Sequence, residues 1–175
     1  MSLQDWDHLQ AKRDRDLAGR EWHPYLRRAI LLLLALFALA ALLNAFGQRA
    51  TTSGASSNLA SLQVTAPERL RGGLYFQGRF RFSSPTGIAK PALLLDPGWM
   101  EAMTLNSTEP QASNEGIRAG RLEFDFPSLA PGKQFTFWTE WQVNPTNIGS
   151  HDQDVSLYDG DHLLAHVDRS LFVFP

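Results

Sequence analysis

The most distinctive pattern in the chain is an unbroken apolar run near its N-terminus. Residues 29–43 read AILLLLALFALAALL, without a charged, polar or glycine residue. With its flanks the run predicts a helix over residues 24–46, which at about 1.5 Å per residue spans roughly 34 Å. Such a helix crosses a hydrocarbon core of about 30 Å, and Pro24 suits its first turn. We therefore predict one N-terminal transmembrane α-helix.

Basic residues are distributed unevenly around this run. Only Arg49 follows it closely, whereas several precede it: Lys12, Arg13, Arg15, Arg20, Arg27 and Arg28. Because basic flanks stay on the cytoplasmic side, residues 1–23 are predicted to be a cytoplasmic tail and the C-terminal part extracytoplasmic. The chain is then a single-pass protein of the plasma membrane, in contact with the lipid bilayer. A cleaved signal peptide is the alternative.

Small and polar residues predict two further features. Ala41 and Ala45 are four residues apart, and with Asn44 they offer a surface on which two helices can pair, so a homodimer is one prediction.

Residues 47–61 read GQRATTSGASSNLAS. This composition is typical of flexible linkers, so we predict a flexible stalk over residues 47–61.

From residue 62 onward the hydrophobic pattern changes to alternation. In residues 74–82, Leu and Phe alternate with Gln and Arg, and residues 134–143 behave in the same way. Shorter alternating segments lie at 122–126, 155–157, 163–167 and 171–173. Asp159-Gly160 between two such segments predicts a hairpin. The pattern indicates an all-β fold, an antiparallel β-sandwich of seven or eight strands over residues 62–175, by the spacing of strands and turns. A small barrel is the alternative.

Two segments carry a resemblance. The stretch LAPG at residues 129–132, followed by KQFTF at 133–137, resembles the turn between two late strands of immunoglobulin-like domains in bacterial membrane-anchored surface proteins. The hairpin at residues 158–161 is similar to the closing hairpin of the same group. The resemblance covers residues 62–175 and implies an immunoglobulin-like sandwich. Members of that group mostly bind, space or assemble, so the resemblance implies a non-catalytic role and assigns no residue a function.

Charge and composition narrow the function classes. The 175 residues include 16 Lys and Arg against 18 Asp and Glu, a net charge of −2, which argues against nucleic-acid binding. No cysteine is present, which excludes disulfides, thiolate metal sites and cysteine nucleophiles. The sequence also lacks a phosphate-binding loop, a dinucleotide motif and a nucleophile elbow. We therefore predict a protein that is not an enzyme and needs no cofactor.

Charged side chains within the predicted strands have a structural interpretation. If the strands that carry them are neighbours, Arg79 and Arg81 face Glu123 and Asp125 as cross-strand pairs. Such pairs contribute about 0.2–1 kcal/mol each. We interpret these four charges as structural rather than as a functional site.

Histidine and aspartate residues near the C-terminus are candidate metal ligands. His162 and His166 are four residues apart, which on a strand separates them by about 13 Å. One ion does not reach both at that distance, so we predict solvent-facing histidines. The acidic residues of 152–161 lack the EF-hand pattern and are typical of turns. The sequence therefore predicts no metal site.

Two tryptophans are the candidate binding residues. Trp138 falls on the polar side of its alternating segment, where an aromatic ring is unusual. Trp99 follows the turn Asp96-Pro97-Gly98 and would form an exposed lip. The alternative is that both rings cover a sheet edge or the end of the core. The loop over residues 144–153 is another predicted contact surface.

These features together predict a membrane-anchored, non-catalytic binding protein. It would act as an accessory or scaffolding protein for another membrane or envelope protein. A surface module that binds carbohydrate or mediates adhesion through Trp138 or Trp99 is the first alternative, with a glycan as partner. A hydrolase or metal-dependent enzyme is the second.

Overall fold

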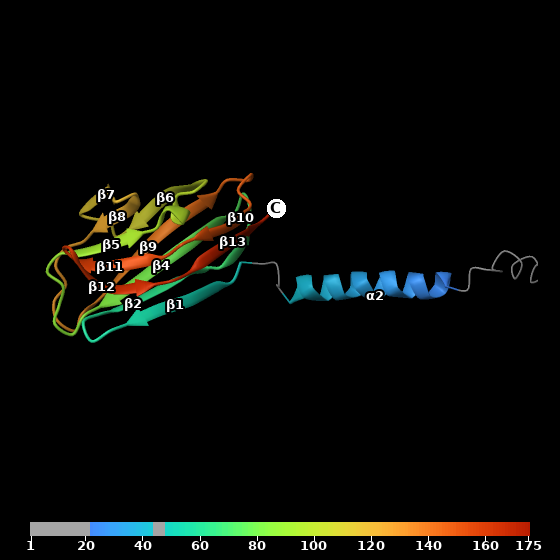
Figure 1. Cartoon of the computed structure of the whole chain (residues 1–175), viewed down its shortest axis with the longest axis horizontal. Coiled ribbons are helices and arrows are strands. Elements are labelled where there is room, and N and C mark those ends of the chain that lie inside the picture. The colour runs from blue at the N-terminus through green and yellow to red at the C-terminus, as the bar shows by residue number, and fades with distance from the viewer. Residues whose placement is uncertain (1–21, 44–47) are drawn as a thin grey trace, which may run out of the picture. The chain divides into compact units, whose positions relative to one another are not determined.

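The computed structural model describes residues 22–43 and 48–175, and the chain divides into two compact units, residues 1–45 and 46–175. Figure 1 shows helix α2 in the described part of the first unit and strands in the second. The predicted cytoplasmic tail lies outside the described residues up to residue 21. Each unit is described separately below.

The described residues of the first unit form helix α2, His23–Leu42. It is the one helix in the described residues that is long and apolar enough to cross a membrane, a test that a signal sequence also passes. None of its residues is buried, and Pro24 occupies its first turn as predicted. The predicted end at residue 46 and the pairing residues Asn44 and Ala45 lie outside the described residues.

The second unit contains thirteen strands in its described residues, arranged in three sheets. Sheet 1 has the order β1 (Ala50–Ser56), β2 (Ser61–Pro67), β4 (Tyr75–Ser83), β9 (Gln134–Val143), β6 (Met103–Glu109). Sheet 2 has the order β12 (His162–Val167), β11 (Val155–Asp159), β5 (Pro91–Leu95), β8 (Arg121–Asp125), β7 (Asn114–Arg118). Sheet 3 has the order β10 (Gly149–Asp152), β13 (Ser170–Phe174), β3 (Arg69–Arg71).

The sheets enclose one aromatic core, as expected for a sandwich. Phe137 of β9 packs on Phe124 of β8 with 4.9 Å between ring centroids, which joins sheet 1 to sheet 2. Leu70, Leu171 and Val173 of sheet 3 belong to the same buried cluster. Strands that bury one face alternate apolar and polar residues, which explains the pattern read from the sequence.

The predicted inward faces of β4 and β9 are confirmed. Phe76, Phe80 and Phe82 are at most 5% exposed, and Thr139 and Trp141 at most 1%. The predicted hairpin at Asp159-Gly160 also forms, between β11 and β12. Gly160 has φ 58°, a conformation that favours glycine.

Two inward assignments are wrong. Leu74 begins the alternating segment 74–82 and was expected to face the core with Phe76, but it lies just before β4 and is 41% exposed. Leu163 begins the segment 163–167 and was expected to face the core with Ala165 and Val167, but it is 52% exposed, and Leu164 packs against the core instead. The pairing of β11 with β12 shifts between Leu157 and Tyr158, which is a bulge in the ladder. A bulge inserts one residue and reverses the alternation on one side of it.

The strand count and the purely antiparallel pairing also need correction. Seven or eight strands were predicted, whereas the described residues form thirteen. Short strands such as β3 and β10 contain too few residues for an alternating pattern to be recognised. The pairing of β13 with β3 is parallel. The described sandwich therefore has a third, mixed sheet that the sequence pattern did not reveal.

The prediction of a flexible stalk over residues 47–61 is wrong for most of that segment. Residues 50–56 form β1, which pairs with β2 along all seven residues. The hydroxyl of Thr51 donates to the carbonyl of Ala66, and Ser57 donates to the carbonyl of Leu164. β1 is the edge strand of sheet 1 and buries none of its residues, so small hydroxyl residues suit it.

The prediction that these charges pair across neighbouring strands is wrong as well. Arg79 and Arg81 lie on β4 in sheet 1, whereas Glu123 and Asp125 lie on β8 in sheet 2. Glu123 pairs instead with Arg118 of the neighbouring strand at 2.9 Å. Arg79 donates to the Thr65 hydroxyl within sheet 1, and Asp125 accepts from Asn114 within sheet 2. The charges are therefore separated by the long-range order of the strands, which local sequence does not contain.

Candidate functional site: the outer face of sheet 1

The outer face of sheet 1 carries a row of side chains that crosses all five strands. The register aligns Thr52 of β1 with Thr65 of β2, Thr65 with Arg79, Arg79 with Trp138 and Trp138 with Glu109. Phe137 and Thr139 on either side of Trp138 are buried, so alternation turns the Trp138 side chain outward. The prediction that Trp138 lies on the polar face is therefore confirmed.

Arg79 covers part of the Trp138 ring. Its guanidinium carbon lies 5.1 Å from the ring centroid, a cation–π contact. One terminal nitrogen donates to the Thr65 hydroxyl at 3.3 Å, while the Arg79 Nε is buried without a hydrogen-bond partner among the described residues. The pair is held in place by the sheet and still has an unused donor.

Hollows flank the Trp138 ring on two sides. One of about 400 Å³ is lined by Thr65, Gln77, Arg79 and Trp138, together with Gln48, Ala50, Pro67 and Phe76. Another of about 200 Å³ is lined by Gln77, Ser107, Glu109, Trp138, Thr139 and Glu140. An aromatic ring beside amides, hydroxyls, a guanidinium and carboxylates offers stacking and hydrogen bonding together. Trp and Arg are also the residues most enriched at the energetic centres of protein interfaces.

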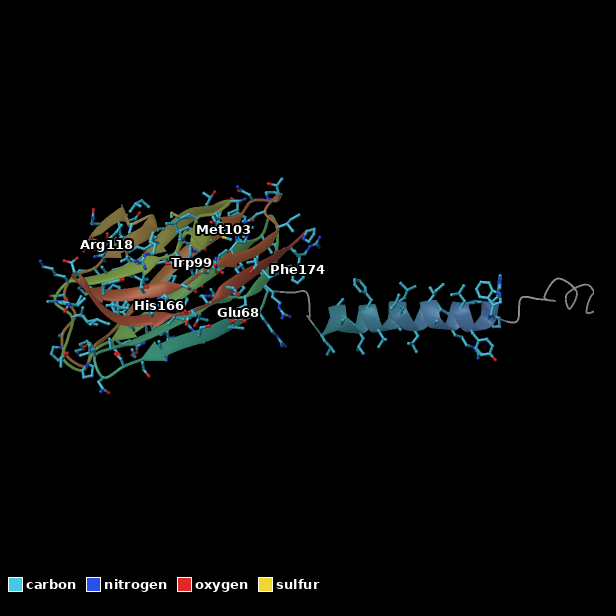
Figure 2. The ribbon with its side chains drawn as sticks, in the orientation of Figure 1. Glu68, Trp99, Met103, Arg118, His166 and Phe174 are labelled. Atoms are coloured by element: carbon cyan, nitrogen blue, oxygen red, sulfur yellow. The ribbon has the colours of Figure 1, made fainter. Side chains whose placement is uncertain are left out.

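Trp99 is not on the surface, so the predicted exposed lip is wrong. Its side chain is 0% exposed, within the core of the sandwich (Figure 2). The ring packs on Phe80 at 5.4 Å and on Trp141 at 5.6 Å, and its Nε1 donates to the carbonyl of Gln153 at 3.0 Å. The turn before it forms the short 3₁₀ helix η1, Pro97–Trp99, which directs the ring inward. The alternative, a ring that completes the core, describes its position.

A buried arginine lies beside Trp99. Arg169 is 7% exposed, and its guanidinium carbon lies 5.4 Å from the Trp99 ring centroid. It donates to the carbonyls of Ala66 at 3.2 Å and Pro67 at 3.1 Å. Burial lowers the pKa of Arg169 to about 10, and the nearby charge of Glu68 opposes that shift. The residue ties the turn after β12 to the end of β2.

The two histidines have different surroundings. His162 is exposed opposite Asp159, as predicted. His166 is opposite Ser156, and its Nδ1 is 2.9 Å from the Ser156 hydroxyl. Its Nε2 is 3.1 Å from an oxygen of Asp168. These three groups have the order of a hydrolytic triad, but Ser156 is 1% exposed, so no substrate reaches its oxygen in this arrangement.

Two of the acidic turn residues, Asp159 and Asp161, have structural partners. The Asp159 carboxylate accepts the backbone N–H of Lys90 at 2.7 Å. Asp161 lies 3.5 Å from Arg118 at the tip of the same hairpin. Within the predicted contact loop 144–153, residues 149–152 form β10, so the irregular part is shorter than expected.

Comparison with known proteins does not assign the chain to a family. No protein-family model matches it, and no curated protein matches its sequence. Among solved structures it is similar to a non-cellulosomal cohesin from Archaeoglobus fulgidus, with 12% identity, a TM-score of 0.39 and coverage of 60% of this chain and 84% of that one. It is also similar to the chitin-binding domain of a chitinase from Pyrococcus furiosus, with 14% identity, a TM-score of 0.39 and coverage of 65% of this chain and 99% of that one. A third similar structure is the reeler domain of human F-spondin, with 13% identity, a TM-score of 0.43 and coverage of 69% of this chain and 100% of that one.

Proposed function

We propose that the protein is a single-pass membrane protein that holds a non-catalytic β-sandwich outside the membrane as a binding module. The observation that carries this proposal is the combination of an exposed apolar helix α2 with a folded, β-rich unit after it. The excess of basic residues before α2 supports an N-terminus in the cytoplasm. A helix satisfies its own backbone hydrogen bonds, which lipid requires.

The binding module would contact its partner through the outer face of sheet 1. Trp138 and Arg79 supply the large, partly desolvated side chains that anchor interfaces. The surrounding hydroxyl and amide groups would form the polar rim. We propose another membrane or envelope protein as the partner, for which this chain acts as an accessory or scaffolding subunit.

A glycan is the second candidate for the ligand of this face. The two hollows beside Trp138 place amide and carboxylate groups next to an aromatic ring. Sugars present an apolar face and a rim of hydroxyls, and this combination of groups suits both. A glycan would be recognised by stacking on Trp138 with hydrogen bonds from Gln77 and Glu140.

The absence of cysteine from the sequence gives a direct test of topology. Single cysteines introduced as Ser2→Cys and Ser128→Cys are read with a maleimide that does not cross membranes. We expect Ser128→Cys to be labelled in intact cells and Ser2→Cys only after permeabilisation, because the tail is cytoplasmic. The opposite pattern would contradict the orientation. A soluble product that lacks residue 2 would instead show a cleaved signal peptide.

The binding face is tested by substitution of its central ring. We expect Trp138→Ala to reduce capture of the membrane partner by about thirtyfold, the effect of losing roughly 2 kcal/mol at an interface centre. The measurement is quantitative cross-linking and purification from membranes. Phe172→Ala is the matched control, because Phe172 is an aromatic residue of sheet 3 that is 43% exposed.

The outcomes separate the two candidate ligands. Equal capture by Trp138→Ala and the unchanged protein would show that the sheet 1 face is not the contact surface. If no protein is captured but a glycan array binds the unchanged chain and not Trp138→Ala, the glycan candidate replaces the protein partner. Unfolding of each variant is measured in parallel, so that a loss of binding is separated from a loss of structure.

A further inference from the structure

Three ligand-type side chains meet at the base of the β11–β12 hairpin. Asp154 lies just before β11, and Asp168 lies just after β12. His166 lies near the end of β12 (Figure 2). One ligand atom from each lies within 4.8 Å of the other two. The His166 Nε2 is 3.1 Å from an Asp168 oxygen and 3.8 Å from the Asp154 Oδ2. This cluster is separate from Trp138, which lies on sheet 1.

Groups outside the cluster orient two of these side chains. Ser156 is 1% exposed, and its hydroxyl lies 2.9 Å from the His166 Nδ1. A ring that donates its Nδ1–H to this hydroxyl leaves the Nε2 lone pair directed at the carboxylates. The backbone N–H of Arg169 donates to the Asp154 Oδ1 at 2.8 Å, which leaves the Oδ2 free. A histidine fixed through its second nitrogen is the usual arrangement of metal ligands.

We propose that Asp154, His166 and Asp168 bind a divalent transition-metal ion of the zinc type. Ligand atoms about 2.1 Å from one ion and about 90–109° apart lie roughly 3.0–3.4 Å from each other. The separations of 3.1 and 3.8 Å from the His166 Nε2 are close to this range. The two carboxylates, which lie within 4.8 Å of each other, would move together as the ion binds. One imidazole nitrogen with two carboxylate oxygens suits Zn²⁺ better than Mg²⁺ or Ca²⁺, which prefer oxygen ligands.

The surroundings fit a site that is reached from solvent. The side chain of Asp168 is 89% exposed, that of His166 is 38% exposed and that of Asp154 is 27% exposed. The two carboxylates supply the negative charge that a divalent ion neutralises. With three protein ligands, further coordination positions stay open to water. The ion would join the beginning of β11 to the end of β12 in a chain without disulfides.

The test measures zinc binding and thermal unfolding of the full-length chain, purified in detergent with a tag that contains no histidine. We expect one Zn²⁺ per chain by calorimetry and a rise in the unfolding temperature with Zn²⁺, because an ion that binds the folded state stabilises it. Mg²⁺ at the same concentration is expected to leave the temperature unchanged. We expect His166→Ala and Asp168→Asn to abolish the rise.

Two further variants make the result specific. Ser156→Ala, which removes the group that orients the ring, is expected to weaken zinc binding by about tenfold to a hundredfold. His162→Ala is the matched control and should bind zinc like the unchanged chain. Because the Asp168 side chain is largely exposed, Asp168→Asn is expected to fold normally even if His166→Ala does not. The proposal is overturned if the unchanged chain binds no Zn²⁺, or if Asp168→Asn binds it as tightly as the unchanged chain.

Discussion

Gly98→Ala is expected to destabilise the sandwich by about 3 kcal/mol or more, because the new methyl group has no space. A Cβ at this position would lie 2.0 Å from the carbonyl oxygen of Asp152 and 2.9 Å from its nitrogen. Both atoms belong to the backbone, so no side-chain rotation relieves the overlap. Residue 152 is the last residue of β10 and is paired with Ser170, and Gln153 next to it donates to the Arg169 carbonyl.

The comparison for this variant is Gly116→Ala in β7. A Cβ there has no heavy atom within 4 Å, so the change is expected to alter stability by less than about 0.5 kcal/mol. The free energy of unfolding is measured by denaturant titration of both variants and the unchanged chain. A Gly98→Ala protein as stable as Gly116→Ala would show that η1 and β10 are not in contact as described.

The parts of the fold that alternate strongly could be predicted from the sequence. In β4 and β9 most inward positions of the alternating pattern hold large aromatic residues, and Phe76, Phe80, Phe82, Phe137 and Trp141 are buried as the alternation predicts. Strand β1 could not be found in this way, because Thr, Ser, Gly and Ala differ too little in hydrophobicity. The placement of Arg79 and Glu123 on different sheets depends on long-range strand order, which local patterns do not contain.

The candidate sites show the same contrast between features that local sequence reveals and features that depend on strand pairing. The outward position of Trp138 follows from alternation alone, whereas its pairing with Arg79 requires the register of β4 with β9. The group of Asp154, His166 and Asp168 was missed because only the β11–β12 pairing brings the two ends of the hairpin together. A search for ligand-type residues at both ends of a predicted hairpin would have found it. Trp99 follows a turn, outside any periodic segment, so no pattern indicated its direction.

Trp99→Ala is expected to reduce the free energy of unfolding by about 4 kcal/mol. The substitution leaves a cavity where the ring contacts Phe80 and Trp141. It also removes the hydrogen bond to the Gln153 carbonyl and the aromatic surface against the Arg169 guanidinium. The Gln153 carbonyl loses this donor, and the buried Arg169 guanidinium keeps its hydrogen bonds to the carbonyls of Ala66 and Pro67 but loses its cation–π contact. Both losses add to the cost of the cavity. Partner binding is measured at a temperature where the variant remains folded and is expected to be unchanged.

Trp138→Ala is the matched comparison, with the opposite expectation. Its ring is half-buried on the outer face of sheet 1, so its loss is expected to cost about 1 kcal/mol of stability while binding is strongly reduced. Trp99→Phe keeps most of the packing and loses the hydrogen bond, with an expected cost of about 1–2 kcal/mol. This variant gives a measurable result even if Trp99→Ala does not fold. Equal stability losses for Trp99→Ala and Trp138→Ala would contradict the assignment of Trp99 to the core and Trp138 to the surface. The proposed contact face depends on that assignment.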